Sequence, residues 1–307
     1  MRKFGGSWSE SKLDCVERYV QAYLQVMQKQ TWCTLDYVDA FAGRGQQALK
    51  STTGSGDSTA EIESFFGNNS ERADTEEFLV GSAIRALRAS VKAIRPFDHF
   101  IFIDENKPSC RELEAIVENE FSAIHNTITV ECGDANEVLD RYVATVDWSR
   151  ARALVFLDPY GLEVSWGLIQ RLAGTDACDV WYLFPLGGVI RMMMNDGHLP
   201  DSWKGRLNTV FGTSTWYDEF YRPSGQQSLF DKQERDRLFK DASTPQVVDF
   251  VRRRLQTVFP AVSDAGILRN GNGAPLFALL LCVSNPSTKA QATALRIANH
   301  LLRELSQ

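Results

Sequence analysis

The sequence predicts an α/β fold in which a largely parallel sheet is covered by helices on both faces. Short, nearly continuous apolar strands alternate with amphipathic helical segments along most of the chain, which is typical of βα units. The first predicted strand runs into the turn Tyr37-Val-Asp-Ala-Phe-Ala-Gly-Arg-Gly45. Its two glycines let a ligand approach the backbone closely, as beneath a cofactor in an α/β sheet.

Composition places the chain among ordinary globular proteins. It has 307 residues and a net charge of −6, and we find no apolar run long enough to span a membrane. The N-terminus lacks the apolar stretch of a secretory signal. The six cysteines form no C-x-x-C pair, so we expect reduced, mostly buried thiols in a cytoplasmic protein rather than disulfides or a zinc site. The acidic balance argues against a broad nucleic-acid surface but leaves a local basic groove open.

The periodicity of apolar residues and the positions of glycines predict the first helices, strand and loop of the chain. Apolar residues at three- and four-residue steps predict a helix over 12–30, and a strand follows over about 33–41. Residues 46–80 are rich in Gly, Ser, Thr, Asn and Glu, and we expect a long loop there. That loop is either a functional lid or an uneventful solvated connection. Gly81-Ser82 then begins a helix that ends before Pro96.

The middle of the chain alternates regularly between strands and helices, for which right-handed crossovers are the default. The predicted strands are 97–104, 127–132, 153–158 and 179–185, and the predicted helices are 109–121, 135–146 and 165–173.

The last part of the chain completes the sheet. Residues 186–265 are mainly helical and polar, and we interpret them as an insertion that could contact a substrate or partner. Strands at 266–270 and 276–284, joined near Asn270, would place the last strand antiparallel to its partner, and a helix covers 288–304. The core, 1–185 and 266–307, then has the layout of a Rossmann-like, seven-stranded methyltransferase sheet.

Acidic residues follow the first four predicted strands, at Asp39, Asp104, Asp134 and Asp158. Ligands of open α/β sheets bind outside these strand ends. A metal-dependent nuclease would need clustered acids, whereas these are spread along one edge, so we predict no metal site.

The form D-x-F-x-G-x-G resembles motif I of class I S-adenosylmethionine methyltransferases. Asp104, or Glu105 as second choice, would accept the ribose hydroxyls, and Asp134 would contact the adenine amino group. Asp39 would organise the turn or reach the methionine amino group through water. Capping stays open for two of these acids: Asp104 could cap the next helix, although Ser109 is better placed, and Asp134 could cap the helix after it. The predicted cofactor-binding residues are Asp39, Phe41, Ala42, Gly43, Gly45, Asp104, Glu105, Asp134 and Ala135.

The turn Asp158-Pro159-Tyr160 provides the predicted catalytic residues. In amino-methyltransferases a D/N-P-P-Y/F turn accepts hydrogen bonds from the target amine and stacks an aromatic ring on the base, so catalysis is largely positioning. Here one proline is missing. A simple strand-to-helix turn and a contact to the cofactor alone therefore remain alternatives.

The region 186–265 combines aromatic and basic residues, including the run Arg252-Arg253-Arg254. Such residues could stack on and neutralise a nucleic-acid strand, or they could be core aromatics beside a solvated basic helix face. Met192-Met193-Met194 could line a substrate channel or pack in the core.

Together these motifs resemble the family of three-Cys-motif partner proteins (TcmP). The resemblance spans nearly the whole chain, and its motifs are Lys12-Leu13, Tyr37 to Gly43, Gly81-Ser82, Phe102-Ile-Asp-Glu105, Gly133-Asp134, Leu157-Asp-Pro-Tyr-Gly161 with Trp166, and Ala274 to Asn285. Arg44 and Tyr160 depart from the Pro and Phe that we expect more often in this family.

The resemblance implies a bacterial, methyltransferase-related protein with a separate three-cysteine protein as its partner. We therefore predict an S-adenosylmethionine-dependent methyltransferase for an amine acceptor, most naturally a nucleobase, in a nucleotide or nucleic-acid substrate. The alternative is an accessory, non-catalytic protein that works with the three-Cys-motif partner in phage defence or on a mobile element.

Overall fold

The computed structural model describes residues 7–45, 80–223 and 238–305. The predicted polar loop, except for Val80, lies outside these residues.

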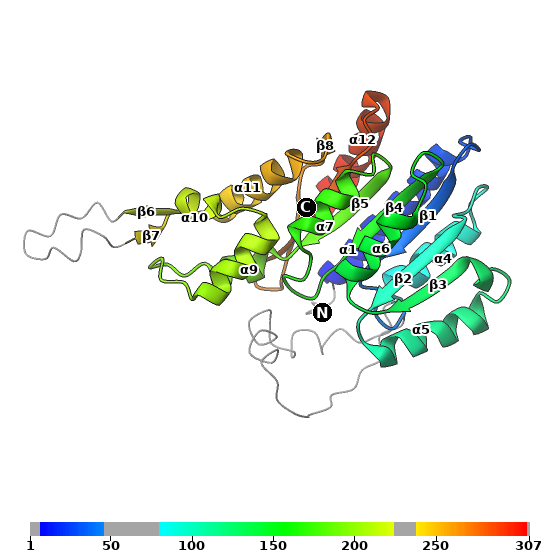
Figure 1. Ribbon diagram of the computed structural model, residues 1–307, viewed down its shortest axis with the longest axis horizontal. Helices are drawn as coiled ribbons and strands as arrows, with labels where there is room; N and C mark the ends of the chain where they lie inside the picture. The colour runs from blue at the N-terminus through cyan, green and yellow to red at the C-terminus, as the bar shows by residue number, and fades with distance from the viewer. Residues whose placement is uncertain (1–6, 46–79, 224–237, 306–307) are drawn as a thin grey trace, which may run out of the picture.

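The centre of the molecule is a mixed, mostly parallel sheet of eight strands in the order β3-β2-β1-β4-β5-β10-β8, with β9 pairing to β10 (Figure 1). Strands β1 to β5 run parallel, and β10 is antiparallel to β9, as predicted. Strand β10 also pairs antiparallel with β5. The sheet has one strand more than predicted, because β8 is only two residues long and leaves no periodic signal. The strands are β1 (Thr34–Asp39), β2 (His99–Asp104), β3 (Ile128–Cys132), β4 (Ala151–Leu157), β5 (Cys178–Phe184), β8 (Ala261–Val262), β9 (Gly266–Arg269) and β10 (Pro275–Val283).

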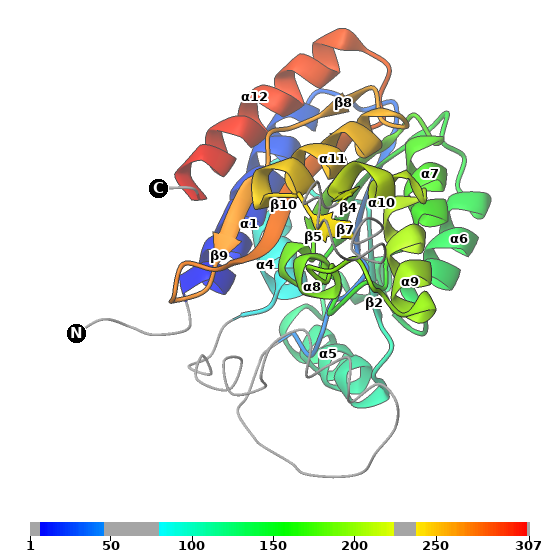
Figure 2. The ribbon, with the colours of Figure 1, turned by 90° about the vertical axis from the view of Figure 1, so that its left-hand side faces the viewer.

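Helices cover both faces of this sheet (Figure 2). Side chains alternate between two cores along β4, where Leu154 and Phe156 face one layer and Val155 and Leu157 face the other. Burial on both faces explains the nearly continuous apolar strands of the sequence. One layer holds α1 (Ser7–Met27), α4 (Ser82–Val91), α5 (Lys107–Glu120) and α12 (Thr288–Leu305). The other holds α6 (Ala135–Thr145), α7 (Trp166–Ala173), α8 (Leu186–Met192) and α11 (Thr244–Gln256).

The segment after β5 extends the second layer beyond the sheet (Figure 1). It adds α9 (Asp201–Phe211), α10 (Thr215–Phe220) and a small antiparallel pair, β6 (Tyr221–Pro223) and β7 (Leu238–Lys240). This pair differs from the purely helical expectation, because strands of three residues are too short to show alternation. Phe211, Phe220 and Phe250 pack together inside it.

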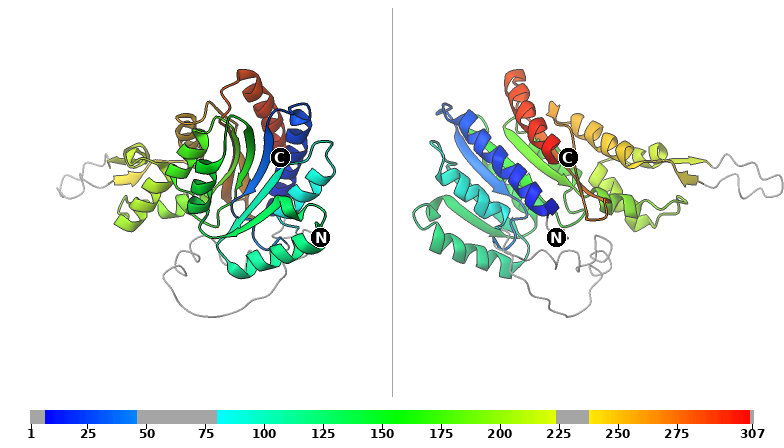
Figure 3. Two further views of the ribbon diagram at one scale, coloured as in Figure 1. Left: turned by 45° about the vertical axis from the view of Figure 1, so that its right-hand side comes forward. Right: turned by 180° about the vertical axis from the view of Figure 1, so that it is seen from behind.

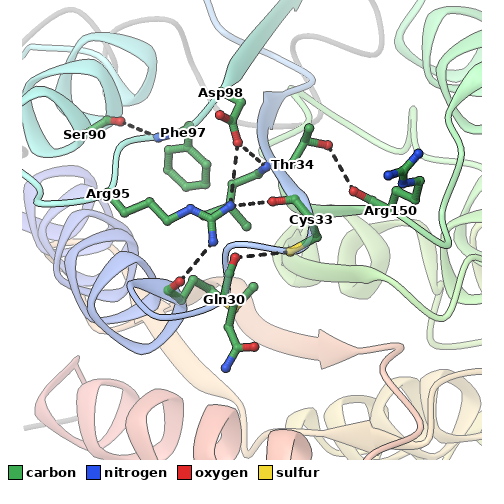
Figure 4. Close-up of polar contacts among 10 residues, drawn as sticks. Gln30, Cys33, Thr34, Ser90, Arg95, Phe97, Asp98 and Arg150 are labelled. Carbon is green, nitrogen blue, oxygen red and sulfur yellow. Dashed lines mark hydrogen bonds and ion pairs between the residues drawn. The ribbon is translucent and has the colours of Figure 1, made fainter.

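Helix α1 lies along the sheet beside α12 (Figure 3). Its 21 residues make it about 32 Å long, enough to run the length of β1. Arg95 fixes one end of this arrangement (Figure 4). Its guanidinium donates to the carbonyls of Met27, at 3.1 Å, and Cys33, and it lies 3.9 Å from the Asp98 carboxylate. Asp98 in turn accepts a hydrogen bond from the Leu35 N–H at 2.8 Å, so Arg95 joins the end of α1 to the start of β1.

We predict that Arg95→Ala lowers the free energy of unfolding by about 2–4 kcal/mol, because the carbonyls of Met27 and Cys33 each lose a charged donor and the Asp98 carboxylate loses its ion pair. Urea denaturation measures this. Arg88→Ala is the matched control, since its ion pair with Glu120 is exposed and contributes at most about 1 kcal/mol. Equal losses in both variants would contradict the role assigned to Arg95.

Candidate functional site

The candidate site lies at the carboxyl edge of the sheet, where β1 stands between β2 and β4. The strand order reverses at this point, and open α/β sheets bind their ligands there. The turn after β1 places Gly43 at φ +62° and Gly45 at φ +73°, a region that favours glycine. The Gly45 carbonyl accepts a hydrogen bond from the Gly81 N–H at 2.9 Å. The two glycines that flank residues 46–80 therefore lie next to each other at this edge.

A buried ion pair occupies the end of β4. Lys12, from the first turns of α1, donates to Oδ2 of Asp158, and its side chain is 7% exposed against 21% for Asp158. The Lys12 ammonium also lies 5.7 Å from the centre of the Trp8 ring and 6.0 Å from that of Phe156. These rings contribute a further attraction for the cation in a place that water barely reaches.

Asp39 is a second carboxylate beneath this pair. It is fully buried, and burial raises its pKa to about 7. The Asp158 charge raises the pKa further, whereas Ser82, the Phe41 N–H at 3.3 Å and Lys12 lower it. Oδ2 of Asp39 has no hydrogen-bond partner among the described residues. Such a strained ionisable group at a strand end is characteristic of functional sites.

Asp104 holds the glycine turn. Its Oδ2 accepts the Gly43 N–H at 3.0 Å and lies 3.5 Å from the Tyr160 hydroxyl, while its Oδ1 accepts the Asn106 N–H at 2.7 Å. One carboxylate thus joins the end of β2, the turn after β1 and the turn after β4. Asn106, rather than Asp104 or Ser109, caps α5 by accepting the Ser109 N–H.

The two glycines of the turn serve different purposes. A Cβ on Gly43 would have only the Tyr160 hydroxyl nearby, at 3.8 Å, so the backbone is bare toward the site. A Cβ on Gly45 would lie 2.9 Å from the Leu113 side chain and 3.3 Å from that of Ile84. Gly45 is therefore needed for packing against α5 and α4.

The other predicted residues lie around this centre. Asp134 caps α6 by accepting the Glu137 N–H at 3.0 Å, and its carboxylate is exposed. The Glu105 carbonyl accepts a hydrogen bond from the Cys132 thiol at 3.8 Å. Tyr160 is 48% exposed, and its N–H donates to Glu163 at 3.0 Å. Of the remaining predicted residues, Phe41 is half-buried, and Ala42, Ala135 and Pro159 are buried.

The structure therefore brings Asp39, Gly43, Asp104, Asp158 and Tyr160 together and leaves Asp134 at the periphery. Sequence reasoning assigned no role to Lys12. The sequence did contain a sign of this role, because Lys12 lies four residues before Val16 and so on the same, apolar face of the predicted first helix.

The three consecutive arginines of α11 all contact other groups of the protein. Each of its three arginines has acidic, carbonyl or aromatic partners, which supports the structural interpretation over a free cationic strip. The contacts are Arg252 with Asp264 and the Ser263 carbonyl, Arg253 with Glu219 and Asp249, and Arg254 with the Trp166 ring and the Phe211 and Gly212 carbonyls. Met192 and Met193 are buried, whereas Met194 is 41% exposed.

Two negative findings concern the described residues alone. No group of three His, Cys, Asp or Glu side chains is arranged there to hold a metal ion. No helix within the described ranges is both long and apolar enough to cross a membrane.

Comparisons with known proteins add little to this picture. No family model matches the chain, and no curated protein matches it. Among solved structures, the chain is similar to protein LPL1258 of Legionella pneumophila, a protein of the family DUF519, with 12% identity and a TM-score of 0.46. The match covers 94% of this chain and 92% of that one. This likeness is too distant to transfer any property.

We predict that Lys12→Met lowers the free energy of unfolding by about 3–5 kcal/mol, because it leaves the Asp158 charge buried without a cation. The same change made in an Asp158→Asn background should have a clearly smaller effect. A double-mutant cycle by denaturant unfolding measures this coupling. Additive losses would contradict a direct Lys12–Asp158 interaction.

The raised pKa of Asp39 leads us to predict that the stability of the protein depends on pH. The Asp39 pKa of about 7 in the folded protein exceeds the value of about 3.9 expected for an unfolded chain. The folded protein therefore binds the extra proton, and the contribution of Asp39 to stability falls as pH rises from about 4 to about 7. We expect the stability of Asp39→Asn relative to wild type to grow by about 1.4 kcal/mol per pH unit in this window.

Urea denaturation at a series of pH values checks this slope. Asp147→Asn is a control of opposite sign, because hydrogen bonds from Ser149 lower the pKa of Asp147. A stability difference for Asp39→Asn that does not vary with pH would rule out a titrating Asp39.

Proposed function

We propose that this protein is an S-adenosylmethionine-dependent methyltransferase that acts on an amine acceptor, with a nucleobase amino group as the natural candidate. The observation that supports it best is the contact between Asp104 and Gly43. An acid at the end of β2 and a bare backbone at the end of β1 share one edge, beside the point where the strand order reverses. An adenosine cofactor with a ribose diol needs this combination.

The strand order supports the finer fold assignment, a Rossmann-like methyltransferase sheet. The parallel order β3-β2-β1-β4-β5 is that of doubly wound nucleotide-binding sheets. The antiparallel β10 beyond β5 corresponds to the last strand predicted from sequence, and β8 extends that edge.

Each side chain has a role in this proposal. Asp104 would accept the ribose hydroxyls, the backbone at Gly43 would face the methionine part, and Asp134 or Glu105 would meet the adenine. S-adenosylmethionine would supply the electrophilic methyl group.

The acceptor would be oriented by the turn after β4. Lys12 bonds Oδ2 of Asp158, and Oδ1 has no hydrogen-bond partner among the described residues, so it can accept an N–H of the amine. The Tyr160 ring, half-exposed beside it, would pack against the base. Positioning of this kind can supply a large part of the rate enhancement.

Two contacts favour the alternative of an accessory protein that works with a three-Cys-motif partner. Lys12 already donates to the carboxylate that an acceptor amine would use, and Tyr160 already lies on the carboxylate that the ribose would use. Copurification with the three-cysteine protein, together with no binding of S-adenosylmethionine, would support this alternative.

Calorimetry with S-adenosylmethionine and its demethylated product tests the proposed function. We expect wild type to bind both, and Asp104→Asn to bind at least about tenfold more weakly, because hydrogen bonds to a charged group are lost. Tyr160→Phe should bind as tightly as wild type or more tightly, since it frees Oδ2 of Asp104 while the fold is kept.

Asp134→Ser separates capping from cofactor contact, because serine still caps α6 but has no carboxylate. Weaker binding in this variant would assign Asp134 to the adenine. The proposed function is wrong if folded wild type binds neither compound.

A further inference from the structure

A cavity of about 340 Å³ lies at the amino edge of the sheet, opposite the candidate site. It is enclosed by the second half of α1, the first turns of α12 and the loop that contains Trp32. Its floor is formed by Arg152 near the start of β4 and Asp179 near the start of β5. The two helices lie side by side (Figure 3). This volume falls in the range of small-molecule sites.

The floor contains a carboxylate, Asp179, whose buried charge has no ion-pair partner in the described structure. Asp179 interacts with the Tyr19 hydroxyl, and burial raises its pKa to about 7 although the Arg152 charge lowers it. Arg152 forms no ion pair with Asp179 within the described structure. Its guanidinium donates to the carbonyls of Trp148, at 3.0 Å, and Ala151, and its centre lies 4.6 Å from the Trp32 ring centre. The Arg152 guanidinium is thus bonded elsewhere, and Lys289, which also borders the cavity, forms no ion pair with Asp179 among the described residues.

Aromatic side chains form the wall above this carboxylate. The Tyr19 and Tyr23 rings lie 6.4 Å apart, and both residues border the cavity. Tyr23 is 8% exposed, so most of its side chain is buried beside the cavity.

We propose that this cavity binds a small organic ammonium compound, with its cation between the Asp179 carboxylate and the tyrosine rings. A carboxylate and aromatic faces in a poorly hydrated pocket are complementary to such a cation. The remaining atoms of the ligand would fill the apolar part, which Val26, Ala294 and Ile297 border. This site is independent of the proposed methyltransferase function.

Ligand-observed NMR titration of the full chain with benzylammonium, benzyl alcohol and benzoate tests the proposal. The three probes have the same ring and differ in charge. We expect benzylammonium to bind wild type at least about tenfold more tightly than the other two. Asp179→Asn should abolish this preference, and Tyr23→Leu should weaken benzylammonium binding by about threefold to tenfold.

Two controls keep the test clear. Asp179→Asn removes a charge that burial already disfavours, so it should fold, and thermal unfolding verifies this. Asp176→Asn changes an exposed aspartate three residues earlier, at φ 54°, where asparagine is well tolerated, and should leave binding unchanged. Equal affinity for all three probes would show an apolar cavity only, and tighter binding of benzoate would assign it to Arg152 and Lys289. Either result, no saturable binding of benzylammonium, or unchanged binding in Asp179→Asn would overturn the proposal.

Discussion

The buried ion pair between Lys12 and Asp158 is the interaction on which the candidate site depends. It connects the first helix of the chain to the end of the fourth strand, across a separation of 146 residues. This ammonium acts on two carboxylates, the partly buried Asp158, to which it donates, and the buried Asp39, whose pKa it lowers while Asp158 raises it. Burying ions costs several kcal/mol each even when they are paired. Packing alone would not require such an arrangement, so its place at the switch point of the sheet favours a functional origin.

Asp104 at the same edge is held by the protein's own groups. A carboxylate can accept about four hydrogen bonds, and Asp104 has three such contacts, with the Gly43 and Asn106 N–H groups and the Tyr160 hydroxyl. The two backbone contacts fix the turns and are compatible with a bound ribose. The contact from Tyr160 is a side-chain contact that a single rotation breaks. Under the proposed function, the Tyr160 hydroxyl would have to leave Oδ2 of Asp104 before a ribose hydroxyl could bond there.

Sequence reasoning recovered the centre of the sheet because β1, β4, β5 and the second half of β10 are buried on both faces, which gives continuous apolar runs in the sequence. It missed β8 and the β6–β7 pair, because strands of two or three residues are too short to show the alternation of apolar and polar residues that marks a strand. It placed Asp39, Gly43, Asp104 and Asp158 at one edge, since parallel strands end together. It missed Lys12 as a member of the site, and it missed the packing of Gly45 against Leu113. Both depend on contacts between distant segments, of α1 with β4 and of the turn with α5, which no local sequence pattern contains.

Each of the two edges of the sheet holds a carboxylate whose charge burial disfavours, but the groups around the two carboxylates differ. Burial raises the pKa of Asp39 and of Asp179 to about 7 in each case, and α1 covers both. At the carboxyl edge α1 contributes Lys12, whose ammonium lies in the cluster. At the amino edge, about 10–16 Å further along the helix, it contributes Tyr19 and Tyr23 instead, and Arg152 is bonded to carbonyls. Helix α1 thus provides a cation at the carboxyl edge and aromatic side chains at the amino edge. In the proposal above, this contrast would let the second edge take a cation from solution beside Asp179, in a cavity that Arg152 and Lys289 also border.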